Sequence, residues 1–176
     1  MVSELVYIAV GSNIDPGEHI PPAVTAVANS PGITLNAISS FYISDAEGRP
    51  EQPQYRNGVI AIETDIPPEI LKFDVLRPIE TAQGRIRTED RYAPRTIDLD
   101  IILYKDLELH SGSVKVPDSA IWQHPFVTIP LLEIAPTICI PGLAGDLATH
   151  APTSPESLLK VDNSLTHLLQ KGLLHG

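Results

Sequence analysis

Short apolar runs, separated by prolines and glycines, dominate the pattern of this chain. Runs rich in β-branched residues predict buried strands at 5–10, 33–43, 55–64 and 96–104, with a weaker strand at 114–116. Two helices are expected between them, over 23–28 and 65–83. Residues 15–18 resemble a helix start, with a capping side chain, a proline and an early acid. Because proline breaks a helix interior but is tolerated in the first turn, the first helix is instead expected to begin at the Pro21-Pro22 pair.

The resulting order of elements, βαββαβ, is typical of an α+β sandwich with helices on one side of an antiparallel sheet. A polar loop at 44–53 is long enough to be mobile and functional. Residues 1–141 are expected to form the main domain, and 142–176 a linker and an amphipathic helix with capping-box spacing at 153–156. We expect that helix to dock on the domain, with partner binding as the alternative. Its apolar stripe comprises Leu158, Val161, Leu165, Leu168 and Leu169.

Composition and charge narrow the class of protein. Of the 176 residues, 43% are hydrophobic and 19% are charged, which argues against wholesale disorder. The net charge of −10 disfavours nucleic acid and anionic membranes as partners. A single cysteine, Cys139, suits a reducing compartment, and no apolar stretch is long enough to span a membrane. A cytoplasmic location is therefore expected.

The sharpest chemical signal is the pair of carboxylates Asp98 and Asp100. Side chains alternate along a strand, so the two aspartates share one face, about 6–7 Å apart, and repel each other unless a cation lies between them. A pair of Mg²⁺ ions would fit that span. Two solvated acids on an exposed strand face are the alternative.

A basic loop before this strand favours the metal interpretation. Four of the chain's seven arginines fall within eleven residues, namely Arg85, Arg87, Arg91 and Arg95. The planar guanidinium suits bidentate phosphate contacts, so arginines beside a metal-binding pair indicate a Mg²⁺-dependent polyphosphate site. The sequence has neither a P-loop nor a protein-kinase signature.

Other candidate residues allow two interpretations each. Tyr55 and Asn57 share a strand face and would either stack on and hydrogen-bond a flat heterocycle, or form a cross-strand pair and a buried amide. Glu80 would either reach the arginines or be an ordinary exposed helix acid. Core packing is favoured for Phe126, and a surface or hydrogen-bonded position for His124.

Six segments, in order over residues 5–141, carry a resemblance to a known family. They are YIAVGSN at 7–13, SFY at 40–42, QPQYRN at 52–57, IE with GRIR at 79–87, RYAPRTIDLDI at 91–101 and PLLEIAP at 130–136. On these segments the chain resembles the 6-hydroxymethyl-7,8-dihydropterin pyrophosphokinases, which move pyrophosphate from ATP to a pterin alcohol in folate biosynthesis. We therefore expect a ferredoxin-like α+β sandwich with helices on the faces of an antiparallel sheet.

The resemblance implies a role for each candidate residue. Asp98 and Asp100 would hold two Mg²⁺ ions, and Arg85 and Arg95 would assist phosphoryl transfer. The residues implied to bind the pterin are Ser44, Tyr55, Asn57 and Phe126. Those implied to bind ATP are Glu80, Arg87, Tyr92, Arg95, Ile101, Lys115 and His124. The pterin hydroxymethyl oxygen would attack the β-phosphorus of ATP without a protein nucleophile, and the loops at 11–16, 44–53 and 84–95 would close over the substrates.

Several positions depart from the family pattern on the nucleotide side. Asp118 and Ser119 stand where a histidine and an aromatic residue are usual, and His124 stands where an arginine is usual. Each missing charged hydrogen bond would cost on the order of 1.5–3 kcal/mol. A weakened or inactive paralogue that binds pterin or nucleotide is therefore the alternative to an active enzyme. We expect a monomer, with dimerisation through the C-terminal helix as the alternative.

Overall fold

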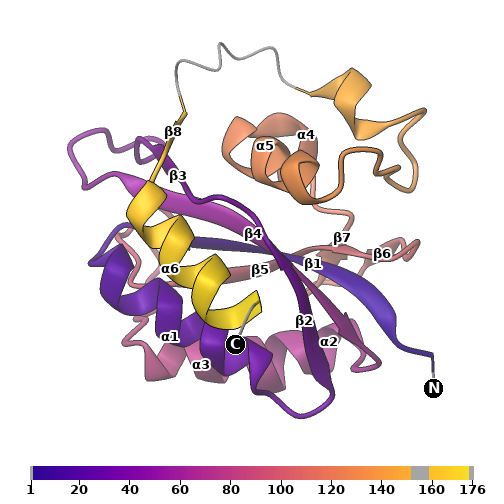
Figure 1. Ribbon diagram of the computed structural model, residues 1–176, viewed down its shortest axis with the longest axis horizontal. Coiled ribbons are helices and arrows are strands. Elements are labelled where there is room, and N and C mark those ends of the chain that lie inside the picture. Colours follow the sequence, from indigo (N-terminus) through magenta and orange to yellow (C-terminus); the bar gives the residue numbers. More distant parts are fainter. Residues whose placement is uncertain (1, 152–158, 175–176) are drawn as a thin grey trace.

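The computed structural model describes residues 2–151 and 159–174, and its centre is an antiparallel sheet (Figure 1). The order across the sheet is β5-β1-β4-β3-β8, and β2 also pairs with β4. The strands of this sheet are β1 (Glu4–Ser12), β2 (Ile33–Ile38), β3 (Tyr42–Ser44), β4 (Tyr55–Thr64), β5 (Asp98–Tyr104) and β8 (Lys160–Val161). A separate antiparallel pair comprises β6 (Leu109–His110) and β7 (Lys115–Val116).

Helices cover both faces of the sheet (Figure 1). One face carries α1 (Pro16–Ala28), α3 (Arg77–Ala82) and α6 (Asn163–Leu174), and the other carries α4 (Ala120–Gln123) and α5 (Pro125–Ile134). The short helix α2 (Pro68–Ile70) and the π-helical segment η1 (Leu71–Leu76) precede α3, and a 3₁₀ turn, η2, spans Leu147–His150. The predicted α+β sandwich with an antiparallel sheet is confirmed, and helices lie on both faces as the resemblance implies, not on one side as the order of elements alone predicts.

Alternation along the central strands builds two apolar layers. On β1, Val6, Ile8 and Val10 are buried in the core with α1, whereas Tyr7 is buried on the opposite face with α5. Strand β4 repeats the pattern, with Ile60 on the first side. The sheet is therefore packed on both faces, and a polar side chain on it needs a partner or a cavity.

The first helix begins earlier than expected and contains both prolines. The N–H groups of residues 18 and 19 donate to Asp15 O, and the helix starts at Pro16 rather than at Pro21. Pro21 and Pro22 each remove a backbone donor, but the helix buries one side against the sheet, and this packing stabilises it. The buried residues are Ile20, Ala23, Val24 and Val27.

The expected second strand is broken into β2 and β3. Between them, Ser39 makes side-chain bonds that interrupt regular pairing, because its Oγ accepts from Val59 N–H at 2.8 Å and donates to Ser40 O at 2.7 Å. The break lets β2 and β3 pair with successive parts of β4. It also brings Ser44, at the end of β3, opposite Tyr55.

The helix expected over 65–83 spans Pro68–Ala82 but is π-helical in its middle. Within it, Arg77 N–H bonds to Lys72 O, five residues earlier. Pro78 has no N–H to give to a carbonyl in the preceding turn, so a wider turn just before it fits the proline. The sequence predicts a kink or shortening at Pro78, and the irregularity takes the form of this π turn.

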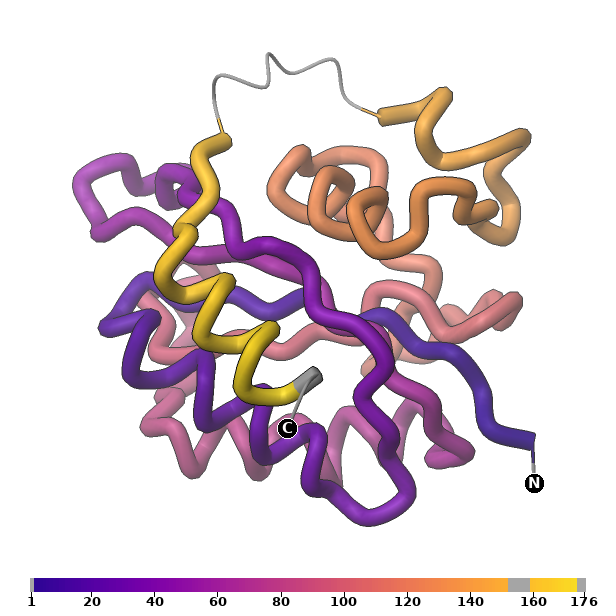
Figure 2. Tube along the Cα trace, viewed as in Figure 1, coloured from indigo at the N-terminus to yellow at the C-terminus, as the bar shows by residue number. Residues whose placement is uncertain are grey.

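The C-terminal segment packs along β3 and β2, as the yellow trace in Figure 2 shows. Asp162 N–H donates to Phe41 O at 2.8 Å, and the Asp162 carboxylate accepts from Leu165 N–H at 3.0 Å and from Arg56 Nε at 2.8 Å. Asp162 thereby caps α6, which begins at Asn163. The expected capping box at 153–156 lies outside the described residues, as does Leu158.

The apolar stripe expected on this helix is only partly correct. Leu165 and Leu169 are buried in the core, so α6 docks on the sheet. Leu168 is 57% exposed, and Val161 belongs to β8 and not to the helix. The helix begins at Asn163, directly after Asp162. The domain boundary placed at residue 141 stays a prediction.

The Asp162 contacts give a stability prediction. Desolvation opposes ionisation of Asp162, but hydrogen bonds from Leu165 and Arg56 outweigh it and lower the pKa of the carboxyl. Asp162→Ala should lower the free energy of unfolding in urea by about 1–2 kcal/mol at neutral pH. Because the folded-state pKa is the lower one, this contribution is full above the unfolded-state value and is lost as the pH falls through the folded-state value.

A matched control for this stability measurement is the pair of Lys105 and Glu4, whose charged atoms lie 2.8 Å apart at the other edge of the sheet. Glu4→Gln removes an exposed ion pair without removing a helix cap. It should therefore change the free energy of unfolding by less than about 0.5 kcal/mol. An equal loss in the two variants would contradict the capping role of Asp162.

Candidate active site

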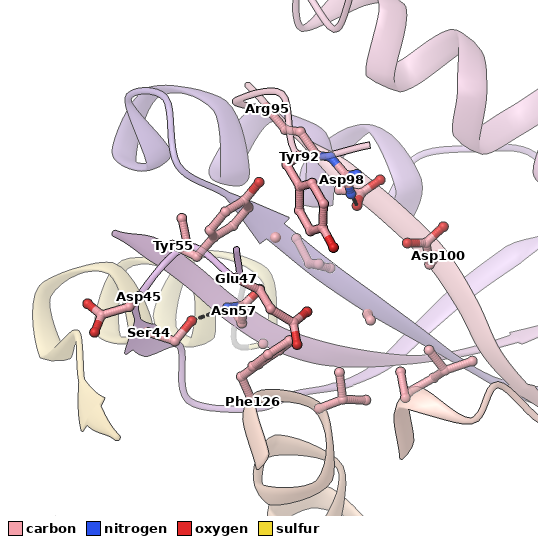
Figure 3. A pocket seen from close by; sticks show the side chains of 18 of the residues that line it. Ser44, Asp45, Glu47, Tyr55, Asn57, Tyr92, Arg95, Asp98, Asp100 and Phe126 are labelled. Carbon is pink, nitrogen blue, oxygen red and sulfur yellow. Dashed lines mark hydrogen bonds and ion pairs between the residues drawn. The ribbon is translucent and has the colours of Figure 1, made fainter. Parts of the chain in front are cut away.

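A cavity of about 280 Å³ opens between the sheet and α5 (Figure 3). Strands β1, β3, β4 and β5 supply its floor, and the loop at 44–53, the basic loop and α5 supply its walls. The structure brings together all four residues expected to bind a pterin and several of the charged candidates. Those at the cavity are Ser44, Tyr55, Asn57, Tyr92, Arg95, Asp98, Asp100 and Phe126.

The two aspartates lie on the cavity side of β5, as alternation predicts. Asp98 pairs in register with Gly11, and Asp100 pairs with Ala9, across β1. Leu99 between them is buried in the core on the other face of the sheet. The sheet therefore fixes both carboxylates on one side of the cavity. Figure 3 shows Tyr92 and Arg95 next to Asp98.

Arg85 and Arg95 both bind Asp98. Arg85 Nη1 donates to Asp98 Oδ1 at 3.0 Å and to Ile97 O at 2.6 Å. Arg95 forms an ion pair with the other oxygen of Asp98 and donates to Arg91 O at 2.7 Å. Arg95 thus lines the main cavity, whereas Arg85 holds the other oxygen of Asp98 from a neighbouring cleft in the basic loop.

Asp100 lies in a different electrostatic setting from Asp98. Repulsion from Asp98 raises the pKa of Asp100, and Lys72 opposes the rise. The main obstacle to its ionisation is thus the charge of another carboxylate. A cation bound between the two would offset this repulsion and stabilise the ionised form. The donor chemistry of the pair therefore fits Mg²⁺, which prefers oxygen ligands.

Glu80 is buried and organises the basic loop. It is 2% exposed, accepts from Leu99 N–H at 2.9 Å and forms an ion pair with Arg87. Arg85 lies 4.0 Å from the same carboxylate, and burial raises the pKa of Glu80. Of the two interpretations of Glu80, the structure supports contact with the arginines.

Asn57 faces the cavity between β1 and β3. Its Nδ2 donates to Ser44 Oγ at 2.8 Å, which leaves Oδ1 beside Gly11. A Cβ on Gly11 would lie 2.8 Å from that oxygen, so glycine is needed for the amide to keep this position. The amide, the serine hydroxyl and the Tyr55 ring thus present a polar edge and a flat surface in one place (Figure 3).

Phe126, at the start of α5, closes the opposite side of the cavity, although the sequence favours core packing for it (Figure 3). His124 stacks on Phe126 with ring centroids 5.0 Å apart and an interplanar angle of 20°. Its Nδ1 lies 3.5 Å from Glu47 Oε1, so the imidazole faces a carboxylate of the cavity wall. The structure therefore places His124 beside the aromatic wall of this cavity.

Comparison with known proteins identifies the family to which this cavity belongs. A family model described as 7,8-dihydro-6-hydroxymethylpterin-pyrophosphokinase (HPPK) matches residues 7–136, which include the aspartates, the basic loop and the aromatic wall. The chain belongs to the HPPK family. Residues 137–176, with β8 and α6, lie beyond the matched region.

Curated relatives agree with the match. Each is named 2-amino-4-hydroxy-6-hydroxymethyldihydropteridine pyrophosphokinase. The Pseudomonas aeruginosa protein is 42% identical over 137 residues, covering 77% of this chain and 83% of the relative. The Haemophilus influenzae protein is 39% identical over 137 residues, with coverage of 77% and 84%. The Methylorubrum extorquens protein is 35% identical over 159 residues, with coverage of 90% and 94%.

A solved structure supports the fold alone. The crystal structure of a Plasmodium falciparum HPPK-DHPS triple mutant superposes with a TM-score of 0.62 at 10% sequence identity. The alignment covers 84% of this chain and 42% of that one. In the described part of this HPPK chain, no helix is long and apolar enough to cross a membrane.

A second cleft of this HPPK chain, about 160 Å³, adjoins Asp100 on the side of the β6-β7 pair. It holds Ile101 and Lys115, two residues expected to bind ATP, together with Lys72 and Asp118. The sequence does not indicate that Lys72 lines this cleft, because only the fold brings η1 against the residue 111–115 segment. Asp118 Oδ1 accepts from Ala120 N–H at 2.8 Å, so this departure from the family pattern caps the start of α4.

Asn13 is another residue that sequence reasoning missed, apart from its place in the YIAVGSN segment. Its Oδ1 accepts from Arg95 N–H at 2.8 Å, and its Nδ2 donates to Gln52 Oε1 at 3.2 Å. Gln52 in turn donates to Tyr92 O at 2.8 Å. Hydrogen bonds around the buried Asn13 amide thereby join the three loops that are expected to cover the substrates.

Proposed function

We propose that this protein transfers pyrophosphate from ATP to 6-hydroxymethyl-7,8-dihydropterin, releasing AMP, in folate biosynthesis. The observation that carries the proposal is one cavity that combines a site for a flat heterocycle with a pair of carboxylates and the guanidinium group of Arg95, which is bound to Asp98. Membership of the HPPK family gives the same reaction. Each half of the cavity suits one of the two substrates.

The pterin half is formed by Ser44, Tyr55, Asn57 and Phe126. A pterin ring has donors and acceptors along its edge, which suit the Asn57 amide, and aromatic faces, which suit Tyr55 and Phe126. The ring would lie between the two aromatic side chains. Its hydroxymethyl group would then point along the cavity toward Asp98.

Asp98 and Asp100 would hold the two Mg²⁺ ions that accompany ATP. In the described ranges, 2–151 and 159–174, no cluster of three or more His, Cys, Asp or Glu side chains is placed to hold a metal. Phosphate oxygens and water would therefore complete the coordination of ions held by these two aspartates. Bound Mg²⁺ would offset the negative charge of the phosphates.

The chain's own residues position the reacting groups and do not react covalently. The pterin oxygen attacks the β-phosphorus, the bond from that phosphorus to the α-phosphate oxygen breaks, and AMP leaves. The pterin hydroxyl loses its proton to solvent. Arg85 and Arg95, already held at Asp98, would stabilise the charge that develops on the transferred group.

The residues proposed to bind ATP have roles of two kinds, contact with the nucleotide and positioning of another residue. Ile101 and Lys115 line the cleft beyond Asp100, and Glu80 acts by holding Arg87. Tyr92, Arg95 and His124 would reach ATP from the main cavity or its rim. A monomer and a cytoplasmic location stay predictions, as does dimerisation through the C-terminal helix.

The alternative is a paralogue that binds but does not react. Both aspartates and both Asp98-bound arginines are in place, and a pure binding module has no need of this charged set. The departures at Asp118 and Ser119 leave the aspartates, the arginines at Asp98 and the pterin residues in place, so they bear on the rate rather than on the reaction. The active enzyme is therefore the favoured interpretation.

The direct test is AMP release from ATP and Mg²⁺, with and without 6-hydroxymethyl-7,8-dihydropterin. AMP that forms only when pterin and Mg²⁺ are both present is the expected result. If no AMP forms although calorimetry shows that the pterin binds, the chain is the binding paralogue. Omitting the pterin is the matched control for contaminating ATP hydrolysis, which needs Mg²⁺ as well.

A further inference from the structure

The two clefts of the protein meet at an acidic edge. Asp100 and Asp118 line both the main cavity and the second cleft, so the two spaces adjoin at these side chains. A substrate whose phosphates lie at Asp98 and Asp100 would extend its remaining atoms into the second cleft. The wall of the second cleft that lies opposite these two aspartates would therefore face the nucleotide and not the pterin.

Lys72 stands on that wall in a fixed position. It lies in the π-helical segment Leu71–Leu76, and its Nζ donates to Ser113 O at 2.6 Å across the cleft mouth. Within the described ranges it forms no ion pair and no other hydrogen bond. An ammonium group has three N–H donors, so two remain for a ligand.

Lys72 also differs from the other lysine of the cleft. Lys115 is exposed, so its charge is screened by solvent, whereas Lys72 is half-buried and held by the Ser113 carbonyl. A half-buried, pre-positioned cation binds an anionic ligand without first losing side-chain freedom. The positive charge that best complements a nucleotide here is therefore that of Lys72.

We propose that Lys72 is a nucleotide-binding residue, which donates from Nζ to an oxygen of ATP while it holds the residue 111–113 turn. The proposal rests on the function proposed above and deepens it. It supplies a cation on the nucleotide side, where Asp118, Ser119 and His124 depart from the family pattern. The competing interpretation is that Lys72 only anchors the turn through Ser113.

Lys72→Gln separates the two interpretations. The glutamine amide can still donate to Ser113 O, but it has no charge for the nucleotide. Loss of one charged hydrogen bond should raise the KM for ATP about tenfold or more and leave the KM for the pterin within about twofold. Lys72→Arg, which keeps the charge and donors, should recover most of the ATP affinity. A wild-type KM for ATP in Lys72→Gln would overturn the proposal.

Lys105→Gln is the matched control, because Lys105 is a surface lysine paired with Glu4 and lines neither cleft. It should leave both KM values unchanged. Urea unfolding of all variants checks the fold, and a variant that raises both KM values equally would point to the anchoring role alone and so overturn the proposal.

A binding measurement keeps this inference separate from the function. Titration with a non-hydrolysable ATP analogue and Mg²⁺ reads nucleotide affinity without turnover. Weaker binding by Lys72→Gln, with less dependence on salt concentration, supports the proposal whether or not AMP forms. Equal binding by wild type and Lys72→Gln contradicts it, even where pterin-dependent AMP formation has established the reaction.

Discussion

Asp100→Asn is expected to abolish turnover without destabilising the protein. Asp100 would lose its ability to hold a cation, and we expect kcat to fall by about a thousandfold or more. Its carboxylate is repelled by Asp98, so the amide should leave the free energy of unfolding unchanged or raise it. Steady-state AMP formation and urea unfolding measure the two effects on one preparation.

Asp98→Asn is the informative partner of this variant. It should also lose turnover, but it removes the charge that Arg85 and Arg95 share. Two guanidinium groups without a counter-charge should lower the free energy of unfolding by about 1–3 kcal/mol. Unchanged turnover in either variant would sink the metal assignment, and equal stability of the two variants would contradict the distinct settings described for the two carboxylates.

Asn57→Ala is expected to remove pterin binding selectively. The amide lies against Ser44 on the cavity floor, and its loss leaves the edge of the heterocycle without a partner. We expect pterin affinity to fall by about 10- to 100-fold, with affinity for the ATP analogue unchanged. Calorimetry with each ligand alone tests both statements.

Two further variants sharpen the pterin test. Gly11→Ala places a Cβ 2.8 Å from Asn57 Oδ1 and should weaken the pterin in the same direction by displacing the amide. Asn36→Ala, whose side chain donates to Glu63 on the exposed surface, should change neither affinity. Equal loss of pterin and nucleotide affinity in Asn57→Ala would contradict a dedicated heterocycle site.

Apolar runs and alternation carry much of what the sequence predicts correctly. The strands near 5–10, 55–64 and 96–104 follow from β-branched apolar runs, and the shared face of Asp98 and Asp100 follows from a two-residue period, which a buried sheet enforces. Helix boundaries were less predictable. Pro21 and Pro22 lie within the first helix because burial of its apolar side outweighs the loss of two backbone hydrogen bonds. The local sequence alone does not show which of these two effects is larger.

Contacts between distant segments account for what the sequence does not predict. Glu80 is buried because β5 crosses its helix and donates Leu99 N–H to it, which helix periodicity alone does not reveal. Lys72 reaches the second cleft only because η1 packs beside the 111–115 segment. The break at Ser39 depends on its bond to Val59, twenty residues away.

The product of the pterin-dependent reaction is the most direct test of the central claim, that this cavity transfers a diphosphate. Mass spectrometry and ³¹P resonance should be recorded on the pterin product after reaction with ATP and Mg²⁺. The account predicts a pterin that carries two phosphoryl groups, formed in equal amount with AMP. A pterin with one phosphoryl group and ADP, or no modified pterin at all, would contradict it.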